Sequence, residues 1–269
     1  RGCELALFLP SKVGNLECTF CLDCVQACPH DNIAIAARVP GEELADDSVR
    51  SVIGRLSHRP DLAALAILFT FGALLNAFAM IGPVYAVEEW LSSALHTTAE
   101  AVVLGIIFIA ALIVVPLALC GGAAALARML SRSTLSVTDI AVRYAYALVP
   151  FGFGVWLSHY SFHFLTAIFT VIPVAQSAAV DLAGRPLLGE ADWRWLGMRP
   201  GEVYPLQIGM IILGMLGSLV TVHNISERDH PDQPHRASAA WNVVVIALAI
   251  AALWTIAQPM EMRGTVLGG

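Results

Sequence analysis

Charged residues are scarce in this sequence. Only 13% of its 269 residues are Asp, Glu, Lys or Arg, roughly half the share of an ordinary soluble domain, and Lys12 is the single lysine. The net charge of −6 excludes a surface that seeks phosphate backbones, so no nucleic-acid partner is expected. Glycine-rich phosphate loops and a Ser-His-Asp series are missing too, which leaves nucleotide hydrolysis and covalent catalysis without support.

Hydrophobic residues make up 57% of the chain, with a mean hydropathy of +0.71. The charges gather at the start, since fourteen of the Asp, Glu, Lys and Arg residues lie within 1–60. This distribution excludes a single soluble globule and a disordered chain. It predicts a small head at 1–39, a polar linker at 40–60, a transmembrane bundle at 61–258 and a C-terminal tail at 259–269.

Crossing a hydrocarbon core of ~30 Å takes about 20 helical residues, and four apolar runs are that long: 62–84, 101–129, 206–222 and 239–256. The nearly uncharged region 140–180 contains Pro150 and Pro173. We interpret it as one long kinked helix with an interfacial continuation, because no turn-forming cluster separates its halves; two spans joined near 158–161 are the alternative. The expected fold is an all-α membrane bundle of about five transmembrane helices, with six also allowed.

Arginines in the short loops predict the orientation. Arg50, Arg55 and Arg59 precede the first span, the next loop at 85–100 has three Glu and no Lys or Arg, and the loop after that carries Arg128 and Arg132. The pattern predicts a cytoplasmic head, while the loops near the C-terminus do not decide on which side the chain ends.

Five of the six cysteines lie in the first 28 residues. The segment Cys18-Thr-Phe-Cys21-Leu-Asp-Cys24-Val-Gln-Ala-Cys28-Pro29 is the C-x2-C-x2-C-x3-C-P run of bacterial ferredoxins, which ligates [4Fe–4S] clusters. Thiolates three residues apart can wrap one loop around a cluster, and a short strand is expected at 33–37. The head is therefore predicted to be a small ferredoxin-like α+β iron–sulfur domain. Zinc sites use two separated Cys pairs, and disulfides do not suit a reducing cytoplasm.

Two ligand sets are open. In two-cluster ferredoxins the fourth cysteine of the run ligates the other cluster, so the first three need an outside partner. The favoured set is one cluster on Cys3, Cys18, Cys21 and Cys24, with Cys28 bound to a second cluster whose other ligands are expected upstream of Arg1 in a longer protein. The alternative places Cys18, Cys21, Cys24 and Cys28 on one cluster.

The cysteine run joined to a multi-span membrane body resembles the membrane polyferredoxins of the NapH, NosR and CcoG group, and residues 15–32 are most similar to the proteins called FesM. The specific match covers about residues 1–35, and here the spans follow the cysteines, whereas in the NapH and NosR types they mostly precede them. The resemblance implies electron transfer in the inner (cytoplasmic) membrane of a bacterium. Electrons would pass from quinol or a cytoplasmic donor to a membrane or periplasmic redox partner.

Two alternatives accompany this reading. The CcoG-like relatives imply an assembly or maturation factor that reduces a metal for a cuproprotein or oxidase, and Met260 and Met262 are candidate Cu(I) ligands for that role. A transporter or scaffold with a structural or sensory cluster is the other.

Ionisable residues within membrane spans are candidates for function. His159 and His163 are four residues apart and should share a helix face, where they could contact a quinone, move protons, or bind haem or a metal; a purely structural role is equally open. Glu88 and Glu89, just after the first span, are candidate proton acceptors from a quinol. Gly209, Gly214, Gly217 and Ser218 are interpreted as small-residue faces that let helices approach closely.

Overall fold

The structure is a computed structural model that describes residues 3–7, 18–33, 39, 41–46, 55–194 and 197–259. These residues form helices and no strand, and five of the helices are long and apolar enough to cross a membrane. The predicted all-α architecture is thereby confirmed for the described residues, and the five helices able to cross a membrane agree with the five predicted spans.

The α+β character predicted for the head is not supported by the described residues. The head and linker contribute only the short helices α1 (Asp23–Ala27) and α2 (Glu42–Ala45) and a 3₁₀ turn at Leu56–His58. The strand expected at 33–37 lies outside the described residues, apart from Ile33.

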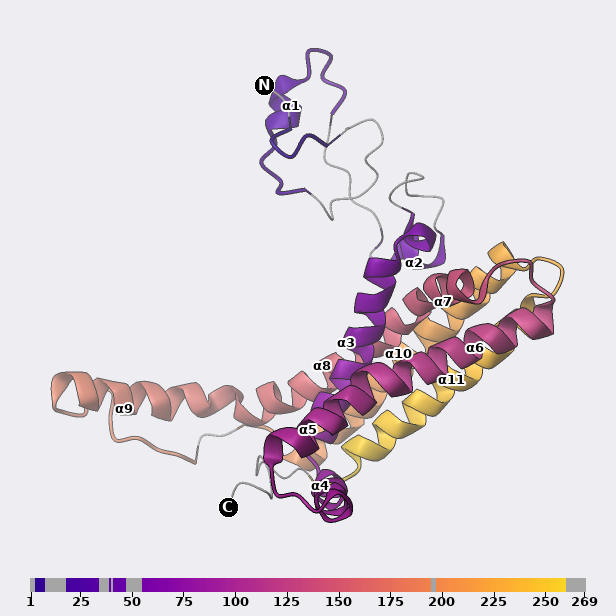
Figure 1. Cartoon of the computed structure of the whole chain (residues 1–269). Helices are drawn as coiled ribbons and strands as arrows, with labels where there is room; N and C mark the ends of the chain where they lie inside the picture. The colour runs from indigo at the N-terminus through magenta and orange to yellow at the C-terminus, as the bar shows by residue number, and fades with distance from the viewer. Residues whose placement is uncertain are drawn as a thin grey trace. The chain divides into compact units, whose positions relative to one another are not determined.

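Figure 1 follows the spans along the chain. Single helices form three of them, α3 (Pro60–Phe78), α10 (Pro200–Asp229) and α11 (Pro234–Ile256). The second span joins α5 (Glu100–Ile109) to α6 (Val115–Ser131). The third, of 47 residues, runs through α7 (Val137–Ala145), α8 (Val149–Ala167) and α9 (Val171–Ala183), which confirms one long helix where two spans were the alternative.

The first span ends earlier than its hydropathy predicts, and the residues after it are not a loop. α3 stops at Phe78, and α4 (Gly82–Leu95) occupies most of the segment expected as a loop at 85–100. Pro83 lies in the first turn of α4, where its missing N–H costs nothing and its fixed φ suits a helix start. Hydropathy alone does not detect this break, because the residues on both sides of it are apolar.

Proline explains three interruptions within the long helices. A π turn at Ala110–Val114 comes just before Pro116, and 3₁₀ turns at Tyr146–Leu148 and Ile168–Thr170 come before Pro150 and Pro173. Proline lacks an N–H and its ring crowds the carbonyl four residues earlier, so the preceding turn changes its hydrogen-bond spacing. Pro205, near the start of α10, has no such turn before it.

The chain divides into two compact units. One comprises Arg1–Leu68, Leu117–Val149 and Leu219–Val244, and the other Phe69–Pro116, Pro150–Ser218 and Val245–Gly269. In the first unit Leu56, Ala63, Ala145 and Tyr146 form a buried apolar cluster. The hydroxyl of Tyr146 donates to the carbonyl oxygen of Arg59 over 2.6 Å, so the turn before α3 is attached to the end of α7.

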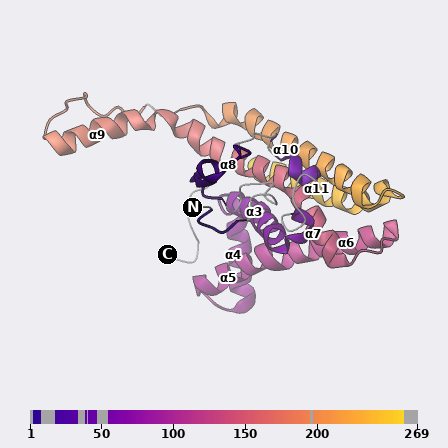
Figure 2. The same cartoon turned by 90° about the horizontal axis from the view of Figure 1, so that it is seen from above.

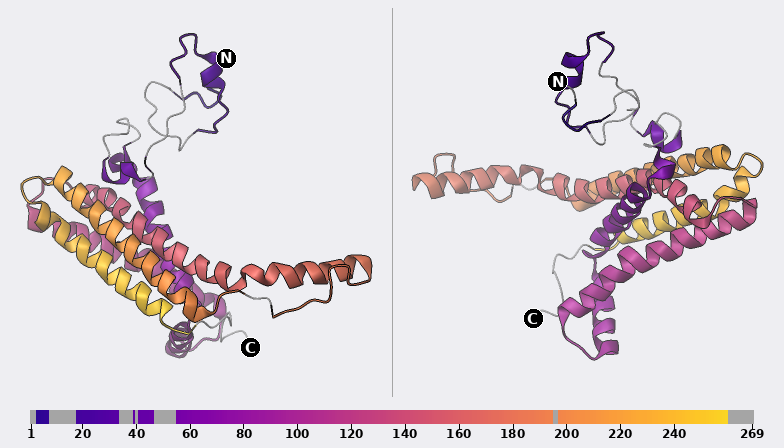
Figure 3. Two further views of the ribbon diagram at one scale, coloured as in Figure 1. Left: turned by 180° about the vertical axis from the view of Figure 1, so that it is seen from behind. Right: turned by 45° about the horizontal axis from the view of Figure 1, so that its top comes forward.

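In the second unit α8 and α10 meet backbone to backbone, and Figures 2 and 3 show them side by side. A Cβ added to Gly154 would lie 2.6 Å from the carbonyl oxygen of Met210, and one added to Gly214 would lie 2.7 Å from that of Pro150. The Phe151 N–H donates to Ser218 Oγ over 2.9 Å. The predicted small-residue approach is thus confirmed at Gly214 and Ser218; a Cβ at Gly209 would meet nothing within 4 Å.

We expect Gly154→Ala to destabilise the folded protein, because the added methyl group would collide with helix backbone that cannot move aside. Overpacking of this kind costs about 1–3 kcal/mol, seen as a lower thermal unfolding midpoint by circular dichroism in detergent. Gly209→Ala is the matched control and should leave the midpoint unchanged or raise it, since alanine is the better helix former. Equal midpoints for the two variants would contradict the close contact between the backbones of α8 and α10.

Candidate functional site

The cysteine segment contains α1, which begins between Cys21 and Cys24. Phe20 and Leu22 have φ of 57° and 64°, in the left-handed region that few non-glycine residues adopt. Where left-handed and right-handed residues alternate, successive backbone N–H groups point toward one side. Concavities of this kind bind anions and iron–sulfur clusters. The Phe20 N–H donates to Cys18 Sγ over 3.4 Å, and backbone N–H groups, chiefly those of Asn32 and His30, lower the pKa of the Cys28 thiol.

The donor set fits an iron–sulfur cluster, although its geometry is not assembled. None of the six cysteines, all of which the structure describes, is part of a disulfide; Cys21 is exposed, and Cys3, Cys18, Cys24 and Cys28 are half-buried. In the described part of the chain no three His, Cys, Asp or Glu side chains are grouped so as to hold a metal ion. The thiols and N–H donors are of the right kind, and their convergence stays a prediction.

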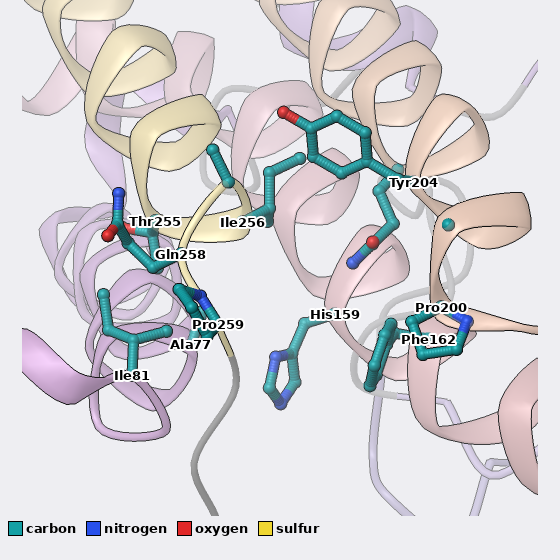
Figure 4. Close-up of a pocket in the computed structure, with 13 residues that line it drawn as sticks. Ala77, Ile81, His159, Phe162, Pro200, Tyr204, Thr255, Ile256, Gln258 and Pro259 are labelled. Atoms are coloured by element: carbon teal, nitrogen blue, oxygen red, sulfur yellow. The ribbon is translucent and has the colours of Figure 1, made fainter.

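A cavity of about 480 Å³ lies in the second unit, where α3 and α11 end and α10 begins. This volume is within the range of small-molecule sites, which are mostly apolar with a few placed polar groups. The apolar lining includes Ile81, Phe162 and Ile256, and the polar lining consists of His159, Tyr204, Gln207, Thr255 and Gln258. Figure 4 shows the His159 imidazole with Phe162 and Pro200 on one side and Pro259 on the other.

His159 and Gln207 are the most deeply buried polar residues of this lining, with 4% and 3% of their surface exposed. Gln207 Nε2 donates to the carbonyl oxygen of Ser158 over 3.3 Å. That contact ties α10 to α8 and leaves the second N–H of the amide available for a ligand. The site therefore offers an imidazole and an amide donor against an apolar wall.

The predicted histidine pair does come together. The rings of His159 and His163 lie 4.8 Å apart between centroids, edge to face, as spacing by four on one helix requires. Only His159 lines the cavity, however. The predicted glutamates separate, since Glu88 in α4 is buried with 2% of its surface exposed whereas Glu89 is exposed. Met260 and Met262 lie outside the described residues.

A buried ionic cluster in the first unit escaped the sequence analysis. Asp229, at the end of α10, pairs with Arg143 of α7 over 3.2 Å and with its neighbour Arg228 over 2.8 Å, and its side chain is only 6% exposed. An acidic residue ending a long apolar helix was the available signal, but its partner Arg143 is 86 residues away in the sequence.

Aromatic rings stack beside this cluster. Tyr144 stacks on Trp241 of α11 at 5.4 Å and on His230 at 6.3 Å between centroids, and its hydroxyl is 3.0 Å from Ser226 Oγ. Burial lowers the pKa of His230, which favours the neutral imidazole. The contacts join α7, α10 and α11 and are best explained as structural.

Comparison of the chain with protein-family models, with curated proteins and with solved structures finds no match.

We expect Asp229→Asn to destabilise the protein by about 3 kcal/mol, because removing one partner of a buried ion pair leaves the other charge uncompensated. The thermal midpoint of unfolding in detergent measures the loss. Asp192→Asn is a matched control, since Asp192 also pairs with an arginine, Arg194, over 2.7 Å, but with that side chain 91% exposed. Exposed pairs contribute little, so a control variant as unstable as Asp229→Asn would contradict the assignment.

Proposed function

We propose that this chain is a membrane-anchored electron-transfer protein that binds [4Fe–4S] through its N-terminal cysteines. The observation that carries the proposal is the spacing of Cys18, Cys21, Cys24 and Cys28 followed by Pro29, which is that of bacterial ferredoxins. The N–H groups directed at Cys18 and Cys28 support it, because hydrogen bonds to sulfur stabilise thiolate ligands and tune their potential. When bound, the cluster supplies one-electron redox chemistry.

The favoured ligand set is Cys3 with Cys18, Cys21 and Cys24, while Cys28 binds a second cluster. The alternative uses the four cysteines of the run on a single cluster and leaves Cys3 out. The two sets differ in what Cys3 does, so a substitution there separates them.

We expect Cys3→Ser to lower the iron and sulfide content of the anaerobically purified protein as strongly as Cys21→Ser does. Cys120→Ser is the control, because Cys120 is buried in α6 and should not affect the iron content. Full iron retention in Cys3→Ser, with loss in Cys21→Ser, selects the alternative set. Full retention in both variants would overturn the cluster proposal.

The membrane body is proposed to exchange electrons with a quinone. Oxidation of a quinol releases electrons and protons together, so its site needs a proton acceptor and hydrogen-bond partners for two ring oxygens. Here His159 can accept a proton at a ring nitrogen, Gln207 can donate an N–H, and Phe162, Ile81 and Ile256 can pack against an apolar ring. The volume and lining of the cavity support this assignment.

The proposed setting is the inner membrane of a bacterium. The arginines before the first span, Arg50, Arg55 and Arg59, support a cytoplasmic position of the cysteine segment by the positive-inside rule. A membrane or periplasmic redox protein is then the partner that completes the chain of electron transfer, and a cytoplasmic donor is an alternative to quinol.

Adding a short-chain quinol to the anaerobic full-length protein in detergent tests the function. We expect bleaching of the cluster's visible absorption and a low-temperature EPR signal, with dithionite as the control for full reduction. His159→Phe should slow reduction by quinol and leave reduction by dithionite unchanged. His223→Phe is the matched control, because His223 is exposed on α10 and is not part of the cavity lining.

Reduction by dithionite without any response to quinol or quinone would overturn the quinone assignment while leaving the cluster in place. The assembly or maturation role would then become the better proposal. An equal effect of His159→Phe and His223→Phe would show that the cavity is not the quinone site.

A further inference from the structure

The third span is much longer than a membrane requires. Its 47 residues extend for about 70 Å at 1.5 Å per residue, against a hydrocarbon core of ~30 Å. α8 alone, with 19 residues, is long enough to cross that core. α9, which continues from α8 in Figures 1 to 3, is therefore surplus to the crossing.

α9 nevertheless carries an apolar stripe on an exposed face. Val171, Val174, Ala175, Ala178 and Leu182 are all exposed, and they recur at i, i+3, i+4, i+7 and i+11, which is the spacing of one helix face. Leu182 has 89% of its surface exposed and Val171 has 66%. In water such a stripe would be unfavourable.

The opposite side of α9 is covered by the chain itself. Gln176 Nε2 donates to the carbonyl oxygen of Leu188 over 3.1 Å, and Gln176 Oε1 accepts from the Asp192 N–H over 3.2 Å. The return segment, described at 184–194 and 197–199, ends against α8, where the Met198 N–H donates to the carbonyl oxygen of Leu165 over 2.9 Å. α9 and this segment thus form a hairpin in which one side of α9 is covered by the chain and the other side is apolar and exposed.

Two further features indicate what covers the apolar side. The turn at Ile168–Thr170 breaks the α-helical hydrogen-bond pattern between α8 and α9, which permits α9 to change direction on leaving the membrane. The return segment exposes Leu187, Leu188 and Trp193 beside charged Asp192 and Arg194, and tryptophan next to charged residues is typical of the lipid–water interface.

We infer that the hairpin of α9 and its return segment lies on the membrane surface, with the stripe from Val171 to Leu182 pressed into the acyl boundary of the lipid. An element that exposes a single apolar side lies in the interface with that side at the boundary of headgroups and acyl chains. The occupant of the apolar face is lipid, because α9 directly continues a lipid-crossing helix. This inference does not depend on the redox function.

Site-specific photo-crosslinking tests the inference on the full-length chain. A photo-reactive phenylalanine derivative replaces Leu182 in one variant and Ala178 in another, and the protein is reconstituted in phosphatidylcholine vesicles that contain an alkyne-tagged lipid. Val180 lies on the opposite face of the same helix and is half-buried, so the same replacement there is the matched control. We expect several-fold more tagged-lipid adduct at positions 182 and 178 than at 180.

Equal lipid adduct at all three positions would overturn the inference, because α9 would then be immersed in the bilayer rather than lying on it. Lack of lipid adduct at 182 and 178 would overturn it as well. Crosslinking of 182 to a protein in native membranes, in place of lipid, would show instead that a partner subunit covers the stripe.

Discussion

Direct contact between the backbones of α8 and α10 is the constraint on which the candidate cavity depends. Gly154 and Gly214 leave no room for a side chain at the crossing, so the two helix axes are held at a fixed, short separation. Close contact between helices matters more in a bilayer than in water. Lipid supplies no hydrophobic force that drives helices together, so their association depends on close packing. His159 follows Gly154 by little more than one turn, and Gln207 precedes Gly214 by about two. Both cavity side chains are therefore placed by the crossing.

The two units are stabilised by different interactions. The second unit relies on close contact between small residues and on backbone donors such as the Phe151 N–H. The first relies on a buried ion pair, stacked rings and the Tyr146 hydroxyl bonded to Arg59. A buried ion pair costs desolvation, so it contributes specificity of register between α7 and α10 more than net stability. The residues that line the cavity thus belong to one unit, and the charges that fix the register of α7 and α10 belong to the other.

The sequence was sufficient for the features that depend on local composition. Apolar runs of about 20 residues predicted five spans, and the spacing of Gly214 and Ser218 predicted a close helix approach. It was insufficient where a partner lies far along the chain. Nothing local to Asp229 points to Arg143, and nothing local to His159 points to Gln207 or Thr255, because these pairs form only through helix packing. α4 was missed because the residues before and after the break at 79–81 are equally apolar, so hydropathy does not reveal that one helix ends and another begins there.

The π turn at Ala110–Val114 has a consequence for how the second span can be compared with any other helix. A π turn holds one residue more than an α turn, and one residue corresponds to a rotation of about 100° around the axis. α5 and α6 are therefore out of phase with each other, and a face traced along α6 in steps of three and four leads to the wrong side of α5. Loss of a single residue from this turn would leave an α turn in its place, so that steps of three and four would again trace one face along both helices.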